Sequence, residues 1–565
     1  MSESVIAAGP TQASAVARRA SLPGRVLPTW TITAVLGAGA LAAAPPSADL
    51  AAASYRSDLF GRAGFTLWDN GWYGGHHIPA YSLLAPALGW LIGPRLLAVV
   101  SMTIAAALFA ALIEGRFPAR ATRIAATWLA LGAAIALLSW RVAFDLGLAV
   151  GMGALLLAQR DRRAPALALA ALCAFASPVA GAFLALAAIA WAAARRRGWL
   201  PIQLAVAALA PIGLLGLVFP EGGTQPFAAS SFYPALAGVL LIAVLIPSDR
   251  SGAHSQEGAV GQRVLRVGTL LYAVALTGAY VLATPVGGNA DRLGALLAGP
   301  IAACVLAGAP LKGRAAARWR GRVLVALAPF LLYWQANAPV ADFASAASDP
   351  AVHASYYTPL LHELQRLGIG YSARPARIEV VSTVDHWEAR FLAAHVPIAR
   401  GWERQLDTER DALFYAGSAA LTASRYRAWL LQDAVSYVAL PDSRLDYSAK
   451  SEATLLQGTP PPYLREVWRS PHWRLFAVLG APALAQPPAV VTRLGSDSFT
   501  LQTPRAGTFT VRVRFTPYWA LASGHGCVQR APGDWTLLRA PSGGIMRVVV
   551  DFTLARVFDH GARCR

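Results

Sequence analysis

Residues 94–123 have the sequence PRLLAVVSMTIAAALFAALIEGRFPARATR. The part from 96 to 113 holds no charged residue and approaches the ~20 apolar residues that a helix needs to cross a bilayer. Three arginines, Arg116, Arg120 and Arg123, follow it. Because cytoplasmic loops of multi-spanning proteins hold an excess of Lys and Arg, this stretch predicts a spanning helix that ends on the cytoplasmic side.

The same alternation continues on both sides of this stretch. Connections that hold arginine clusters alternate with connections that hold few arginines. The clusters are Arg18/Arg19/Arg25, Arg116/Arg120/Arg123, Arg160/Arg162/Arg163, Arg195/Arg196/Arg197, Arg250/Arg263/Arg266 and the group from Lys312 to Arg322. The arginine-poor connections lie around 46–78, 140–141, 176–178, 220–230 and 284–292. The pattern predicts a cytoplasmic N-terminus and an extracytoplasmic C-terminal region.

The composition agrees with a multi-pass protein of the cell membrane. Only 14% of the 565 residues are charged, against about 25% in an average soluble chain. The formal net charge of +19 would otherwise favour nucleic acid. Most of the basic clusters are short connections between apolar stretches, where arginines fix orientation and contact anionic headgroups. The lipid bilayer is therefore the expected partner, and nucleic acid is not.

The apolar stretches predict an α-helical membrane domain over residues 27–337, after a cytoplasmic tail at 1–26. We expect about eleven spans, near 27–45, 94–112, 122–139, 142–159, 164–177, 178–194, 200–219, 230–247, 264–284, 291–308 and 321–337. Residues 79–93 are apolar, but a span there would break the inside–outside parity. They are expected to form an interfacial or re-entrant helix on the outer face.

After the last span the pattern changes to soluble domains. Residues 338–480 predict an extracytoplasmic α/β domain. Its strands are expected at 378–382, 397–400, 435–440 and 473–478, and its helices at 357–367, 386–394 and 422–433. A Pro/Ala linker follows at 481–488, and residues 489–565 predict a small extracytoplasmic β-sandwich. Its strands are expected at 498–502, 508–515, 535–538 and 545–552.

The four cysteines differ by location. Cys173 and Cys304 lie inside apolar spans and are expected to be packing residues. Cys527 and Cys564 lie in the outer domain, where oxidation is permitted, so the sequence predicts a disulfide between them. The spacings do not match a zinc-ligand pattern.

The first outer loop, residues 46–78, holds the densest chemistry of the chain. It contains Tyr55-Arg56-Ser57-Asp58-Leu59-Phe60-Gly61-Arg62 and then Trp68-Asp69-Asn70-Gly71-Trp72-Tyr73-Gly74-Gly75-His76-His77. Aromatic residues at this depth can also be membrane anchors. The glycine pair beside two histidines indicates backbone close to a ligand, with side chains able to bind a phosphate, a sugar hydroxyl or a metal ion.

This arrangement resembles the GT-C superfamily of integral membrane glycosyltransferases. The shared features are an acidic residue in the first outer loop, interfacial helices, many spans and a C-terminal outer domain. Within that superfamily the chain is similar to a bacterial, actinobacterial-like branch, the "6-pyruvoyl-tetrahydropterin synthase-related" membrane proteins; that domain name implies no pterin chemistry here. The resemblance covers the membrane half in architecture and one loop in motif.

The resemblance implies an inverting transfer of a hexosyl or pentosyl group at the outer face of the membrane. The donor would be a polyprenyl-phosphate sugar, and the acceptor a cell-envelope (cell-wall) glycan or a lipid. By position, Asp58 is implied as the general base and Asp69 is the second choice. The alternative is that either carboxylate is a solvated loop group or an ion-pair partner of Arg56 or Arg62. An acidic pair such as DD or DE, which some members carry, is absent, so dependence on a divalent metal ion stays open.

A donor phosphate also needs a cation near the outer face. Arg292 stands where an arginine-poor connection enters a span, and ionisable residues at membrane depth are functional candidates by default. An ion pair with Asp291 is the alternative, and Arg141 with Asp145 presents the same choice. The candidate substrate-binding residues are Arg56, Trp68, Trp72, Tyr73, His76, His77 and Arg292.

Two segments of the outer domain, 385–388 and 399–407, are rich in residue types that bind sugars. Packing against the membrane domain is an equally good interpretation of both. The nucleophile elbow, the P-loop and the HExxH motif are absent from the sequence, which disfavours hydrolases and ATPases.

Three functions remain in competition at this stage. A glycosyltransferase is favoured because the charges concentrate at the outer boundary. A transporter or flippase of a lipid-linked or small solute is the alternative, although such proteins place charges near the midplane. A non-catalytic envelope scaffold would leave the His76/His77 loop without a role.

Overall fold

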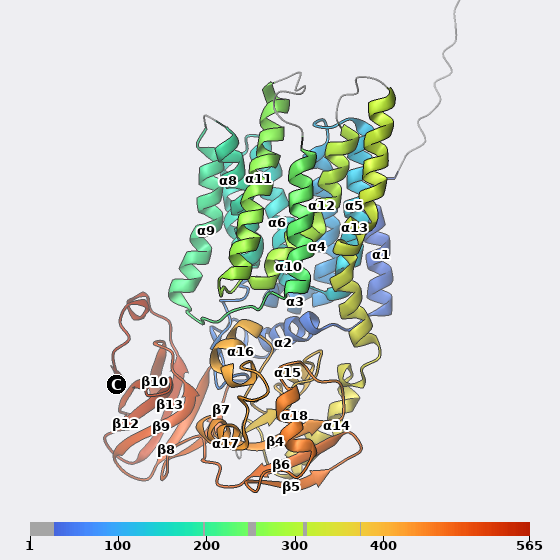
Figure 1. Cartoon of the computed structure of the whole chain (residues 1–565). Helices are drawn as coiled ribbons and strands as arrows, with labels where there is room; N and C mark the ends of the chain where they lie inside the picture. Colours follow the sequence, from blue (N-terminus) through green and yellow to red (C-terminus); the bar gives the residue numbers. More distant parts are fainter. Residues whose placement is uncertain (1–26, 196–197, 247–255, 309–313, 373–374) are drawn as a thin grey trace, which may run out of the picture.

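The computed structural model describes residues 27–195, 198–246, 256–308, 314–372 and 375–565. A bundle of helices forms one end of the molecule, and an α/β domain and a β-sandwich lie side by side at the other (Figure 1). The tail expected at 1–26 lies outside the described residues, as do Arg196, Arg197, Arg250 and Lys312 of the arginine clusters.

Among the described residues, seven helices are long and apolar enough to cross a membrane. They are α4 (Pro94–Ile113), α5 (Ala119–Ala136) with the 3-10 turn η1 (Leu137–Ser139), α6 (Val142–Gln159), α9 (Leu200–Val218), α11 (Gln256–Val281), α12 (Asp291–Gly308) and α13 (Arg314–Ala347). A helix satisfies its own backbone hydrogen bonds, which is why such apolar segments are stable as helices in lipid. Because α13 continues to Ala347, the domain boundary expected at 338 lies inside a helix.

The other four expected spans are shorter helices. They are α1 (Trp30–Ala43), α7 (Arg163–Ala176), α8 (Pro178–Ala194) and α10 (Ala229–Leu245), with 14, 14, 17 and 17 residues. Ser177 separates α7 from α8: its hydroxyl accepts a hydrogen bond from the Ala180 N–H and caps α8, and Pro178 occupies the first helical position. The helices lie where the sequence predicts them, but the count of eleven spans stays a prediction.

About half of the expected first loop is helical, which the sequence analysis missed. Helix α2 (Ala48–Ala63) follows α1 after a 79° bend, and the two together could form one broken span. Ser47 caps α2 by accepting a hydrogen bond from the Leu50 N–H at 3.2 Å. The short helix α3 (Ala85–Ile92) occupies the place of the expected interfacial helix and lies beside α2 at the end of the bundle (Figure 1).

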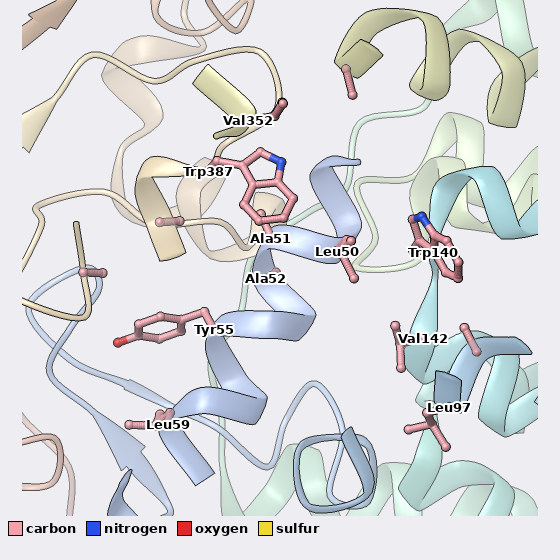
Figure 2. Close-up of a cluster of buried hydrophobic side chains, with 14 of the residues drawn as sticks. Leu50, Ala51, Ala52, Tyr55, Leu59, Leu97, Trp140, Val142, Val352 and Trp387 are labelled. Atoms are coloured by element: carbon pink, nitrogen blue, oxygen red, sulfur yellow. The ribbon is translucent and has the colours of Figure 1, made fainter. Parts of the chain in front are cut away.

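Helix α2 is buried between the two halves of the molecule. Figure 2 shows Trp387 of the α/β domain on one side of α2 and Trp140 and Leu97 of the bundle on the other. Leu50 and Tyr55 of α2 are each only 1% exposed within this core. The bundle and the α/β domain therefore share one continuous hydrophobic core.

The α/β domain is built on a four-stranded sheet with the order β3-β4-β6-β5. Strands β3 (Arg377–Val380) and β4 (Val435–Pro441) are parallel, and β6 (Trp473–Val478) and β5 (Leu464–Arg469) are antiparallel to their neighbours. The helices are α14 (Ala354–Arg366), α15 (Glu388–Phe391), α16 (Arg404–Arg410), α17 (Ala423–Gln432) and α18 (Lys450–Gln457). The strand expected at 397–400 is wrong: that segment makes only an isolated bridge between Ile398 and Ile378.

The last domain is a sandwich of two four-stranded sheets, β10-β13-β8-β7 and β14-β11-β12-β9. Its strands are β7 (Val490–Leu494), β8 (Ser498–Thr503), β9 (Gly507–Arg514), β10 (Trp519–Ser523), β11 (Cys527–Ala531), β12 (Trp535–Ala540), β13 (Gly544–Val550) and β14 (Arg563–Cys564). Alternate residues such as Phe499 and Leu501 face the core, as in other sandwiches. Cys527 and Cys564 lie opposite each other on β11 and β14 and form a disulfide.

Candidate functional site

Charged side chains from four segments meet at the end of the bundle that faces the α/β domain. Asp49 belongs to the first turn of α2, Arg141 precedes α6, Arg292 is the second residue of α12, and Asp342 lies on α13. We call these four residues the rim cluster. Ionisable groups at this depth are costly and are therefore candidates for function.

The two guanidinium groups of the rim cluster are held loosely. Arg141 Nε lies 3.4 Å from Asp49 Oδ2, and Arg141 Nη2 lies 3.5 Å from Asp342 Oδ2. Arg292 Nη2 lies 3.9 Å from the same Asp49 oxygen. Charge-assisted hydrogen bonds are normally about 2.7–2.9 Å long, so these contacts leave the guanidinium groups able to bind another anion.

The rim cluster is also accessible. The side chain of Asp49 is 32% exposed, and those of Arg141 and Arg292 are 22% and 20% exposed. Asp145, one turn after Arg141 on α6, is 2% exposed, and its Oδ2 has no hydrogen-bond partner among the described residues. A ligand can therefore reach a carboxylate and two cations at one place.

Tyr81 and Arg56 connect the rim cluster to the α/β domain. Burial raises the pKa of Tyr81, and the Asp49 carboxylate raises it further. The guanidinium group of Arg56 lies 4.1 Å from the centre of the Tyr81 ring. Arg56 is 2% exposed and donates a hydrogen bond to Glu403 Oε2 at 2.6 Å. Its observed partner is thus a carboxylate of the α/β domain, where we had expected a substrate.

The structure does not place Asp58 in the rim cluster. Its carboxylate is 45% exposed and accepts a hydrogen bond from Arg390 Nε at 3.1 Å. Asp49 and Asp58 both lie on α2, and nine residues of helix correspond to about 13.5 Å. The carboxylate next to Arg292 is therefore Asp49, which the sequence analysis did not single out.

Asp69 is buried in this fold. It lies in the short hairpin formed by β1 (Trp68–Asp69) and β2 (His76–His77) and is 1% exposed. It accepts hydrogen bonds from the Tyr55 hydroxyl at 2.9 Å and from the Gly71 N–H at 3.1 Å. Burial raises the pKa of Asp69 to about 6, although both hydrogen bonds oppose the shift.

The aromatic side chains of the hairpin region contact protein, where we had expected them to bind substrate. Trp68, Trp72 and Tyr73 are at most 2% exposed. The Trp72 indole donates a hydrogen bond to the Ala389 carbonyl at 2.9 Å, and Tyr73 bonds the Glu403 backbone. Trp72 and Tyr73 thus join the hairpin to the α/β domain, and Trp68 packs against Trp519 of the β-sandwich.

The two histidines have different environments. His76 stacks on Trp72 with the ring centres 5.4 Å apart, and neither of its nitrogens has a hydrogen-bond partner among the described residues. Burial lowers the pKa of His76 to about 3. His77 Nδ1 lies 2.7 Å from Glu221, which also pairs with Arg410 at 2.8 Å.

The indoles of the two expected sugar-binding segments are occupied by other side chains. Trp402 stacks on His386 with the ring centres 3.7 Å apart, and the Arg404 guanidinium lies 4.8 Å from the Trp402 ring centre. The Trp402 indole donates a hydrogen bond to the Ala48 carbonyl at 2.7 Å. Trp387 is 3% exposed. Both segments pack against the membrane domain.

The positions of the acidic side chains can be compared with what a divalent metal ion would need as ligands. Within them, no group of three or more His, Cys, Asp or Glu side chains converges as a set of metal ligands. Asp49 and Asp342 are instead paired with arginine. The Arg141 guanidinium lies between these two carboxylates, so a divalent cation bound by both would have to displace it.

Comparisons with known proteins give distant structural likenesses. No protein-family model and no curated protein matches the chain. The chain is similar to the arabinofuranosyltransferase AftD from Mycobacteria, with a TM-score of 0.38 and 16% identity over 77% of this chain and 40% of that one. It is also similar to the archaeal oligosaccharyltransferase AglB from Archaeoglobus fulgidus, with a TM-score of 0.36 and 12% identity over 73% of this chain and 69% of that one. The chain thus spans well under half the length of the first of these glycosyltransferases.

Proposed function

We propose that the protein is a membrane glycosyltransferase whose active site is the rim cluster. The donor is a polyprenyl-phosphate sugar, and the acceptor is a cell-envelope glycan or a lipid. The observation that supports this proposal is a reachable carboxylate, Asp49, next to two loosely held arginines at the end of an apolar bundle. A lipid-linked phosphate reaches that level while its chain stays among the helices.

The proposed reaction is a single inverting displacement. The acceptor hydroxyl oxygen bonds to the anomeric carbon of the sugar as the bond from that carbon to the phosphate oxygen breaks. Asp49 accepts the hydroxyl proton as general base. The polyprenyl phosphate leaves with the electron pair, and Arg141 and Arg292 stabilise its growing negative charge. No step is assigned to a metal ion.

Three carboxylates compete for the role of base, and their surroundings rank them. Asp49 is reachable and lies beside both arginines. Asp58 is reachable, but its partner is Arg390. Asp69 is enclosed by protein. Asp58, the residue implied by the family resemblance, stays a prediction, and Asp49 is the stronger candidate.

Purified protein in proteoliposomes with a polyprenyl-phosphate sugar and an acceptor extract tests the proposal. Replacing Asp49 with Asn keeps its size and removes its basicity, so turnover should fall by ~10²–10⁴ while donor binding survives. Asp58→Asn is the matched control on the same helix and should keep its turnover. If only Asp58→Asn loses turnover, the general base is Asp58 and not Asp49.

The same experiment separates the enzyme from the transporter or flippase. If both variants and the wild type give no sugar transfer, but the wild type moves a lipid-linked sugar between leaflets, the enzyme proposal is wrong.

We also propose that the N-terminus is cytoplasmic and that residues 338–565 are outside. Alkaline phosphatase fused after residues 116, 197 or 314 should then be inactive, and a fusion after 345 should be active.

A further inference from the structure

A loop of the β-sandwich has apolar side chains outside and a charged one inside. The loop comprises residues 551–560 after β13 and includes the 3-10 turn η5 (Leu554–Val557). Leu554 is 76% exposed and Phe558 is 79% exposed, whereas Arg556 between them is 7% exposed. Arginine is normally exposed on soluble surfaces, and large apolar groups are normally covered.

Arg556 holds this loop in shape. Its guanidinium group donates hydrogen bonds to the Pro517 carbonyl at 2.9 Å and to the Gly561 carbonyl at 2.7 Å. It also pairs with Asp559 at 3.0 Å. The two exposed apolar side chains are therefore presented by a fixed loop.

The loop lies at the level where a candidate spanning helix ends. The Tyr518 hydroxyl donates a hydrogen bond to the carbonyl of Val218, the last residue of α9, at 2.6 Å. Phe552, at the start of the loop, packs its ring 5.1 Å from Tyr518 and 6.2 Å from Phe219. The sandwich stands next to the lower end of α9 (Figure 1).

The end of α9 packs against the loop, because Val557 belongs to the same buried cluster as Leu215 and Val218, and this end of α9 also has exposed apolar side chains. Leu214 and Leu217, in the last turns of the helix, are 53% and 55% exposed. In a spanning helix such side chains face lipid. Exposed apolar side chains therefore lie both on the end of α9 and on the loop, and the two segments share one buried cluster.

We propose that Leu554 and Phe558 insert into the lipid leaflet nearest the sandwich and anchor this domain to the membrane surface. The partner is the boundary between headgroups and acyl chains, where exposed Leu and Phe side chains are stable. Two arginines of this region are paired with carboxylates, Arg556 with Asp559 and Arg563 with Asp551. Insertion is therefore expected to depend on apolar burial and not on anionic lipid.

The test uses the full-length protein in nanodiscs of phosphatidylcholine with a nitroxide on Phe558→Cys. The control is a nitroxide on Ile545→Cys, because Ile545 is 60% exposed on β13, about 17 Å along the strand from Val550. The native free cysteines, Cys173 and Cys304, are buried. Power-saturation spectroscopy then compares collisions with oxygen, which enters lipid, and with a water-soluble nickel chelate.

The ratio of oxygen to nickel collisions should be severalfold higher at 558 than at 545. A nitroxide on Leu554→Cys should repeat the result, so the test does not depend on one variant. Equal, water-like ratios at 545, 554 and 558 would overturn the proposal. It would also be overturned if the high ratio appeared only after half of the phosphatidylcholine was replaced by anionic phosphatidylglycerol.

Discussion

Arg56 Nη2 lies 2.6 Å from Glu403 Oε2, and this buried ion pair joins α2 to the α/β domain. The two side chains are 2% and 10% exposed. Burial raises the pKa of Glu403, and Arg56 acts against that shift. Since α2 also carries Asp49, the ion pair links the position of the proposed base to the docking of the outer domain.

Glu403→Gln should loosen this docking. The change leaves the Arg56 charge buried without its anionic partner, which typically costs roughly 3–5 kcal/mol. We expect a lower midpoint of denaturant unfolding in detergent micelles. The control is Asp534→Asn, which removes an exposed partner of Arg530 and should cost less than about 1 kcal/mol. Equal midpoints for the two variants would contradict the role assigned to the pair.

Acid should weaken the interactions of Glu221 with Arg410 and His77. Burial alone would raise the pKa of Glu221, but Arg410 and the hydrogen bond with His77 lower it from 4.5 to about 2. The unfolded chain therefore binds the proton at a higher pH than the folded chain does. The stabilisation is complete above pH 4.5 and is lost as the pH falls towards 2.

Glu221→Gln should remove this stabilisation, roughly 3 kcal/mol, at neutral pH. It should also flatten the dependence of stability on pH between 4.5 and 2. Thermal unfolding followed across this pH range checks both effects. A variant whose curve runs parallel to that of the wild type would show that Glu221 is not the group responsible.

The sequence predicts the helices of the bundle well because their signal is local. A run of apolar residues and an arginine cluster lie within one short stretch, as at 94–123. Helix α2 was missed because its polar and apolar residues are mixed, so it has neither signal. Strand β5 was missed too, since only one of its six residues is buried.

The candidate site is harder to predict because its residues meet through tertiary structure. Asp49 and Arg141 are 92 positions apart in the chain. The only local signal at Asp49 is its place as the first carboxylate after the first apolar stretch. Trp68 and Trp72 were expected to bind a ligand but are buried in contacts between domains. Aromatic residues that pack between domains and aromatic residues that bind ligands look alike in a sequence.

The disulfide should stabilise the end of the sandwich. Replacing Cys527 and Cys564 with Ser removes a cross-link with a sequence separation of 37 residues, for which loop entropy gives about 4 kcal/mol. We expect β14 to separate from β11, with faster amide exchange in residues 560–565. Unchanged exchange after reduction would show that the hydrogen bonds between the two strands suffice.

Arg292→Ala and Arg141→Ala should weaken binding of the donor. Each change removes a charge-assisted contact with the phosphate, and hydrogen bonds to charged groups contribute about 1.5–3 kcal/mol. The Kd for a polyprenyl phosphate should therefore rise about 10- to 100-fold, as measured with the protein in nanodiscs. Arg390→Ala removes an arginine of α15 that contacts Asp58, away from Asp49 along α2, and should leave the Kd unchanged. Asp49→Asn should keep the Kd within a few-fold, because it removes the base and keeps both arginines. If Arg390→Ala weakens binding and Arg292→Ala does not, the phosphate binds near Asp58, and the active site lies at the other end of α2.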